Sequence, residues 1–210
     1  MHAMGMVQVQ QKGNTRLVQL DPNYPHQGLL RSLLSVPDET VDEERVQRTR
    51  SVLALYGAQL VSAFPPPENL PSATDAVLQS MKVLSEDPAM AGTLPVVLWK
   101  NRSDLDPARL VDDARSVGEG QRMGFMLEMT TALSGDERFA HWAATLRDKR
   151  VRRMRNFFRS DRTKQSPYHK QMLELHTPDL ARRWGFLMNM SMQTFEDYFR
   201  KGRAAHVRLE

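Results

Sequence analysis

The start of an α-helix recurs along this chain as a capping residue followed by apolar residues at helical spacing. Thr40, with Glu43 three residues later, forms a capping box. Asp106 stands directly before Pro107, and proline favours the first position of a helix. Three further starts have the same character: Ser72, Asp136 and the pair Thr177-Pro178. This repetition predicts a mainly α-helical protein.

The apolar residues after these starts predict how far the helices extend. One helix should cover residues 40–61, and another residues 119–133. The longest should cover residues 177–202, where the apolar positions keep a period of 3.6. These positions are Leu180, Trp184, Leu187, Met188, Phe195, Tyr198 and Phe199. The run LPVVLW, residues 94–99, is too short to assign and fits either a strand or a buried helical turn.

The N-terminal sequence VQVQQKGNTRLVQL, residues 7–20, has a different pattern. Apolar and polar residues alternate on both sides of Gly13-Asn14, two residues that tolerate the positive φ of a tight turn. Two strands joined by such a turn form a β-hairpin. The expected fold is therefore mainly α, a helical bundle with one N-terminal β-hairpin.

A proline-rich stretch divides the chain. Phe64 is followed by three consecutive prolines, and Pro71 closes the stretch. Successive prolines stiffen a chain, so residues 64–71 are expected to form a linker. The hairpin and two helices would occupy residues 1–63 as a wing-like or dimerisation region. A helical domain would occupy residues 72–210.

The 210 residues include no cysteine. Disulfides, thiolate catalysis and cysteine-ligated zinc or iron–sulfur sites are thereby excluded. No apolar run approaches the roughly 20 residues that span a bilayer. The N-terminal sequence MHAMGMVQVQ lacks the basic and apolar regions of a signal peptide. These features indicate a cytoplasmic protein of bacterial type with no membrane partner.

Positive charge is concentrated in residues 147–164, RDKRVRRMRNFFRSDRTK. This segment has nine Lys or Arg and two Asp, a net charge of +7, whereas the whole chain carries only +4. Arginines neutralise phosphates, and Phe157 and Phe158 among them would offer surfaces on which bases stack. The expected nucleic-acid-binding residues here are Arg147, Arg150, Arg152, Arg153, Arg155 and Arg159. The alternative is a solvated helix end, whose cations favour the helix dipole.

The hairpin tip and the residues after it, KGNTRLVQLDPNYP followed by a leucine-rich helix, resemble the wing of bacterial winged-helix regulators of the MarR and ArsR kind. The resemblance covers about residues 6–34. In that family the wing tip contacts phosphate or the minor groove, a role that Lys12, Asn14 and Arg16 would have here. Only six residues precede Val7, where the family places its recognition helix, so the resemblance implies a truncated or degenerate relative. The alternative is an ordinary structural hairpin that packs on helices.

Two nine-residue segments echo each other: RMGFMLEMT at 122–130 and RWGFLMNMS at 183–191. Both are expected on amphipathic helices, either as a duplication or by chance. Their methionines are flexible side chains that would suit an adaptable groove for a protein partner. The expected partner-binding residues are Met123, Met126, Trp184 and Met188. The alternative, that such side chains simply fill the core, is the favoured one.

The sequence offers no pattern for catalysis or metal binding. None of the six histidines has the spacing of a zinc site, and no nucleophile elbow is present. Gly118, Gly120 and Gly124 imitate a phosphate-binding loop, but they fit helix ends better because no strand leads into them. We therefore expect neither an enzyme nor a metal ion or other cofactor.

Together these features favour a non-enzymatic, DNA-associated regulatory protein that binds the phosphate backbone through its basic segment. The alternative is a protein–protein interaction or assembly subunit that docks through methionine-rich and aromatic helices. A homo-oligomer is expected in either case.

Overall fold

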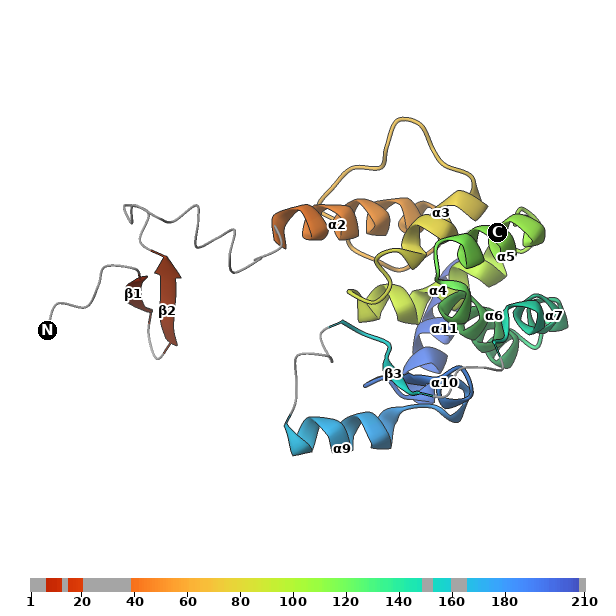
Figure 1. Ribbon diagram of the computed structural model, residues 1–210. Coiled ribbons are helices and arrows are strands. Elements are labelled where there is room, and N and C mark those ends of the chain that lie inside the picture. Colours follow the sequence, from red (N-terminus) through yellow and green to blue (C-terminus); the bar gives the residue numbers. More distant parts are fainter. Residues whose placement is uncertain (1–6, 13–14, 21–38, 149–152, 160–165, 208–210) are drawn as a thin grey trace, which may run out of the picture. The chain divides into compact units, whose positions relative to one another are not determined.

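The computed structural model describes residues 7–12, 15–20, 39–148, 153–159 and 166–207 (Figure 1). The chain divides into two units, Met1–Glu43 and Glu44–Glu210. Nine helices and two pairs of strands lie in the described residues, so the protein is mainly α-helical, as predicted. Within those residues, no helix has both the length and the apolar character needed to cross a bilayer.

The first unit contains two antiparallel strands, β1 (Val7–Lys12) and β2 (Thr15–Leu20). Val7 lies opposite Leu20, and Lys12 lies opposite Thr15. The expected turn, Gly13-Asn14, lies outside the described residues, as does the leucine-rich helix expected after the hairpin. The register is that of two strands joined by a two-residue connection.

The second unit contains the helices and a second pair of strands. The strands are β3 (Arg155–Asn156) and β4 (Phe186–Leu187), which pair in parallel. The helices are α2 (Glu39–Leu55, which begins just before the boundary between the units), α3 (Ala73–Met81), α4 (Pro88–Lys100), α5 (Pro107–Ser116), α6 (Gly120–Ser134), α7 (Glu137–Leu146), α9 (Pro167–His176), α10 (Asp179–Arg183) and α11 (Met192–Val207).

Three predicted helix starts are confirmed by their hydrogen bonds. The Ser72 hydroxyl accepts a bond from the Asp75 amide at the start of α3 (3.1 Å). The carboxylates of Asp106 and Asp136 likewise accept bonds from first-turn amides of α5 and α7, at 3.1 and 3.2 Å. These side chains satisfy amide groups that have no partner within the helix.

α2 differs from the prediction at both ends. It begins at Glu39, so Thr40 lies inside the helix and not at its cap, and it ends at Leu55, short of residue 61. Gly57 follows with a φ of 89°. This backbone region favours glycine, and a residue in it stops a helix.

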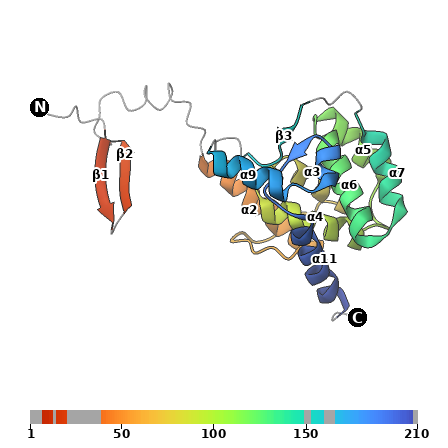
Figure 2. The same cartoon turned by 90° about the horizontal axis from the view of Figure 1, so that it is seen from below.

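α4 lies at the centre of the core. The nine consecutive residues Met90–Leu98 are buried, and the ambiguous run 94–99 is therefore part of a helix. α6 and α11 pack against α4, and the last turns of α11 project beyond the other helices (Figure 2). Gly92 permits close packing with α11, because a Cβ atom there would overlap the Tyr198 ring.

The prediction of one helix over residues 177–202 is wrong. The chain forms the short α10, turns at Gly185 with a φ of 77°, adds β4 and begins α11 only at Met192. Trp184 packs on α6, and the Phe186 ring packs on the Phe157 ring. The apolar residues whose spacing suggested one helix are thus buried against different parts of the core. Beyond Arg183, the last residue of α10, the echo segment 183–191 is consequently not helical, unlike residues 122–130 in α6.

Residues 64–71, expected to separate two domains, lie within the second unit. They belong to the arch that connects α2 with α3 in Figure 1. The Ser62 hydroxyl donates to the Gln47 carbonyl (2.8 Å), and the Tyr56 hydroxyl donates to the Pro71 carbonyl. Hydrogen bonds therefore join the arch to α2 and to Tyr56, which follows α2. The chain divides near Glu43 and not at the prolines.

Candidate functional site

Residues 153–159 are the described part of the basic segment, and we call them the arginine strip. The amides of Arg155 and Phe157 donate to carbonyls in and beside β4, at 2.9 and 2.8 Å. The Arg159 amide donates to the Ser85 carbonyl, in the turn before α4, at 2.7 Å. Three hydrogen bonds thus fix the backbone of the strip to two separate parts of the second unit.

Two phenylalanines fix the strip further. Phe157 is fully buried and Phe158 is 2% exposed. The Phe157 ring lies edge-on to the rings of Phe125 and Phe186, with centroids 5.6 and 5.2 Å apart. The expectation that Phe157 and Phe158 offer stacking surfaces for bases is therefore wrong, because both rings belong to the core. Their burial anchors the strip to α6 and β4.

The described arginines of the strip lie on the surface. Arg153, Arg155 and Arg159 are exposed, and the Arg155 guanidinium lies over the Phe186 ring at 5.7 Å from its centroid. Such a cation–π contact orients the side chain without neutralising its charge. Arg147, at the end of α7, is also exposed. The predicted Arg150 and Arg152 lie outside the described residues.

One carboxylate moderates the charge of the strip. Glu86 Oε1 lies 3.5 Å from Nη1 of Arg159 and 3.9 Å from Nη2 of Arg45 on α2. Neither Glu86 nor Ser85 emerged from the sequence analysis. They lie about 70 residues before the strip, and no sequence pattern joins them to it. A run of arginines identifies a charged segment but not the residues that hold it.

The predicted hairpin site is described only in its backbone. Lys12 is the last residue of β1 and pairs with Thr15, and Arg16 pairs with Gln11. Both Lys12 and Arg16 therefore flank the connection between the strands. Asn14 lies outside the described residues.

The predicted partner-binding residues lie in the core. Met123, Met126 and Met188 are fully buried, and Trp184 is 2% exposed. The Trp184 ring covers Gly124 of α6, since a Cβ atom there would overlap it, and its Nε1 donates to Glu128 (2.5 Å). These four side chains cannot form a docking surface while the protein is folded. They fill the core, which was the favoured alternative.

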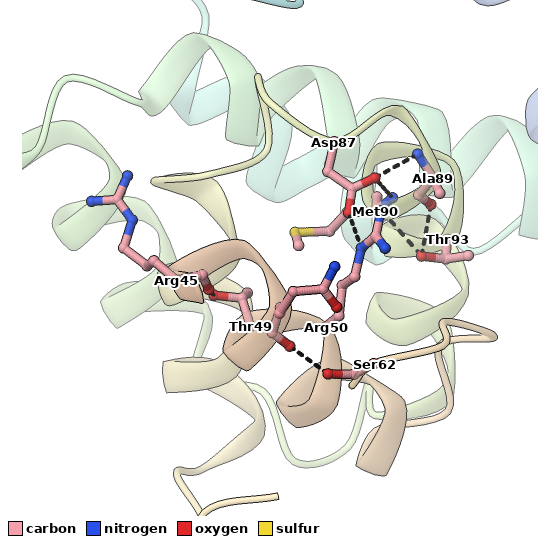
Figure 3. A network of polar contacts seen from close by, with 9 residues as sticks. Arg45, Thr49, Arg50, Ser62, Asp87, Ala89, Met90 and Thr93 are labelled. Carbon is pink, nitrogen blue, oxygen red and sulfur yellow. Dashed lines mark hydrogen bonds and ion pairs between the residues drawn. The ribbon is translucent and has the colours of Figure 1, made fainter. Parts of the chain in front are cut away.

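A second polar cluster joins α2 to the start of α4 (Figure 3). Arg50 Nε donates to Asp87 Oδ2 at 2.6 Å. The other Asp87 oxygen accepts bonds from the amides of Ala89 and Met90, at 3.0 and 3.2 Å. Asp87 is only 2% exposed, and its hydrogen bond raises the pKa of Arg50 further above its ordinary value. Both carboxylate oxygens of Asp87 accept hydrogen bonds from structural partners, so the cluster stabilises the fold.

Among the described residues, no group of three or more His, Asp or Glu side chains is arranged to hold a metal ion. A comparison of the chain with protein-family models, with curated proteins and with solved structures finds no match.

Proposed function

We propose that this protein is a non-enzymatic regulatory protein that binds nucleic acid by the phosphate backbone, with the arginine strip as its contact surface. One observation carries the proposal: Arg153, Arg155 and Arg159 are exposed on a backbone that three hydrogen bonds and two buried rings hold in place.

A fixed backbone favours binding to an extended anion. Because the strip is already ordered, less conformational entropy is lost when its side chains meet phosphates than in a flexible tail. Phosphate contacts position a protein without distinguishing bases, so binding would be largely independent of sequence and weakened by salt. The proposed surface continues through Arg147, Arg150 and Arg152, which precede the strip in the sequence.

The winged-helix resemblance adds a second contact to this proposal. Lys12, Asn14 and Arg16, beside and in the connection of the hairpin, would meet phosphate or the minor groove. A cytoplasmic, bacterial homo-oligomer fits the same role. An assembly subunit, the alternative, would need a different surface, because the four residues expected to dock a partner are buried.

The test is fluorescence anisotropy of the full chain with a random 20-base-pair duplex at about 50 and 200 mM salt. We compare R153S/R155S/R159S with R138S/R200S/R203S, a control that removes the same charge from exposed arginines of α7 and α11. The strip variant should bind more weakly, and the slope of log K against log salt should fall by roughly 3. An equal loss in the two variants, or no binding to wild type at low salt, contradicts the proposal.

Glu86 provides a test in the opposite direction. Glu86→Gln removes the carboxylate that lies 3.5 Å from Arg159 but keeps the size of the side chain. The duplex should bind about twofold to fivefold more tightly at low salt, because the ion pair between exposed Arg159 and Glu86, worth about 0.5–1 kcal/mol, no longer competes with phosphate. Glu137→Gln, an exposed change on α7, is the control for charge alone. Equal gains in both variants would show that net charge, and not the strip, controls affinity.

A further inference from the structure

A pocket of about 610 Å³ lies between α2, the arch after it and the end of α3. Its volume falls within the range of sites for small organic ligands. One wall comes from α2, and another comes from the proline-rich part of the arch, residues 64–67. None of the residues of the arginine strip lines it. The pocket is thus a separate feature of the second unit.

The interior of the pocket is apolar and stiff. Val52, Phe64 and the three prolines Pro65–Pro67 line it. Val52 is 5% exposed and belongs to the core, so the floor is fixed. Consecutive prolines have restricted backbone dihedrals, and the bonds at both ends of the arch hold them over α2. A preformed apolar wall of this kind accepts an apolar body without first having to order itself.

The rim of the pocket is cationic. Arg45, Arg48 and Lys82 line it, against a single lining carboxylate, Glu68. Arg45 and Arg48 are three positions apart on α2, so their side chains share one face of the helix. Figure 3 shows that Arg45 extends away from Arg50 and its buried partner Asp87. Arg45 is therefore not part of the Arg50–Asp87 cluster.

The two arginines keep their side chains over the pocket. Arg48 donates to Glu44 at 2.6 Å, and its guanidinium lies 5.7 Å from the centroid of the Phe64 ring. Arg45 makes a long ion pair with Glu86, at 3.9 Å. The Arg48–Glu44 pair is exposed, and the Arg45–Glu86 pair is long and exposed on its arginine side, so an incoming anion can share the two arginines at little cost.

We propose that this pocket binds an amphipathic carboxylate, a small molecule with an apolar body and one anionic end group. The apolar body lies between Val52, Phe64 and the prolines, and the carboxylate meets Arg45 and Arg48 at the rim. Guanidinium groups match the planar, two-oxygen geometry of a carboxylate, which is the reason for this choice of anion. The pocket shares no lining residue with the arginine strip, although Glu86 pairs with both Arg45 and Arg159, and the proposal goes beyond the nucleic-acid surface.

The test is calorimetric titration of the full chain with decanoate, decan-1-ol and decyltrimethylammonium, each at concentrations at which it is dissolved and monomeric. The three probes have alkyl tails of nearly equal length and carry an anionic, a neutral and a cationic head group. Decanoate should bind one molecule per chain, about tenfold more tightly than decan-1-ol, since the alcohol lacks the charge-assisted hydrogen bonds. The cationic probe should bind most weakly.

Variants locate the binding. R45S/R48S should weaken decanoate about tenfold and leave decan-1-ol within about twofold. R200S/R203S removes equal charge from α11 and should leave both affinities unchanged. Gln79→Trp adds a ring at an exposed lining position and should block all three probes without disturbing the core. Thermal unfolding confirms that each variant is folded.

Three results would overturn the proposal. Equal affinities of decan-1-ol and decanoate would show an apolar site without anion recognition. Equal binding of decanoate to wild type, R45S/R48S and Gln79→Trp would show binding elsewhere. A dimer in sedimentation that decanoate does not affect and that Gln79→Trp dissociates would identify a second copy of the chain as the occupant.

Discussion

Asp87 and Asp136 have the same role in different surroundings. Each caps the first turn of a helix, and each forms an ion pair with an arginine, Arg50 or Arg138. The Asp87 side chain is 2% exposed, whereas that of Asp136 is 18% exposed and its partner is on the surface. The Arg138 hydrogen bond holds the pKa of Asp136 below its ordinary value. The two positions therefore compare a cap whose ion pair is largely buried with a cap whose ion pair lies at the surface.

Asp87→Ala should lower the free energy of unfolding by about 3–5 kcal/mol, because it removes a cap and leaves the Arg50 charge without its partner. Asp136→Ala should cost about 1 kcal/mol, the usual value for a lost cap. Urea unfolding of the two variants at neutral pH measures both. Similar costs at the two sites would mean that burial of the Arg50–Asp87 pair contributes nothing.

The cost of Asp136→Ala should also depend on pH. The pKa of this carboxyl is lowered in the folded protein, so its contribution is complete above the unfolded pKa and is lost as pH falls through the folded value. Wild type and the variant should therefore converge in stability as the pH falls below about 4. A difference that stays constant down to pH 2 would contradict this assignment.

Gly124 is a second residue whose surroundings decide its role. A Cβ atom there would overlap the Trp184 ring, whereas one at Gly120, on the same helix, would lie 3.5 Å from its nearest neighbour, Leu146 Cδ2. The ring is 2% exposed and cannot move without opening the core. Space, and not backbone conformation, accounts for the glycine at position 124.

Gly124→Ala should destabilise the protein by about 2 kcal/mol, since strain of up to about 3 kcal/mol exceeds the gain of about 1 kcal/mol in helix propensity. Gly120→Ala should be neutral or slightly stabilising. Chemical unfolding followed by tryptophan fluorescence measures the difference, and Trp184 should report the displacement directly. Equal stability of the two variants would show that the Trp184 ring accommodates a methyl group.

At the scale of elements, sequence patterns predicted structure that depends on adjacent residues and failed where structure depends on residues distant in the chain. Caps at Ser72, Asp106 and Asp136 were predicted because the capping residue and its helix are adjacent in sequence. The helix over residues 177–202 was wrong because Gly185 turns the chain so that β4 can pair with β3, some 30 residues earlier. Apolar spacing shows that residues are buried but not which neighbours bury them.

The candidate site follows the same rule. The sequence predicted a charged segment at residues 147–164, and its described arginines are exposed. It also suggested stacking surfaces at Phe157 and Phe158, which are core residues. The carbonyls that hold the strip and the carboxylate of Glu86 come from distant parts of the chain. A pattern within one segment contains no information about such partners.

The attachment of β3 to β4 can be tested through Gly185. Gly185→Ala places a side chain at a φ of 77°, which costs about 1–2 kcal/mol and should loosen β4. Hydrogen exchange at the Arg155 and Phe157 amides should accelerate about tenfold, while the Arg159 amide, which bonds to Ser85, should change less. Mass spectrometry or NMR of amide exchange measures these rates.

Gly135→Ala is the matched control for this experiment. Gly135 ends α6 with a φ of 75°, so the substitution has the same backbone cost in a different place. It should lower overall stability without a selective effect on the strip. Equal acceleration at Arg155, Phe157 and Arg159 in both variants would show that the strip opens only with the whole unit.

At the scale of the whole molecule, the two units should be energetically separate. The described core cluster begins at Val52, beyond the first unit. A chain that starts at Glu39, and so keeps all of α2, should match the full chain in free energy of unfolding within about 0.5 kcal/mol. Urea unfolding measures the difference. A loss of several kcal/mol would show that residues 1–38 contribute to the core.

The position of α4 also has a consequence for how this chain is made. α4 precedes α11, which packs against it, by about 100 residues. Ribosomes add about 5–20 residues per second, so about 5–20 seconds pass between the synthesis of α4 and the synthesis of α11. During that interval the apolar face that later meets Tyr198 and Phe199 remains open to water. The apolar helix at the centre of the core is therefore synthesised well before the helix that shields it.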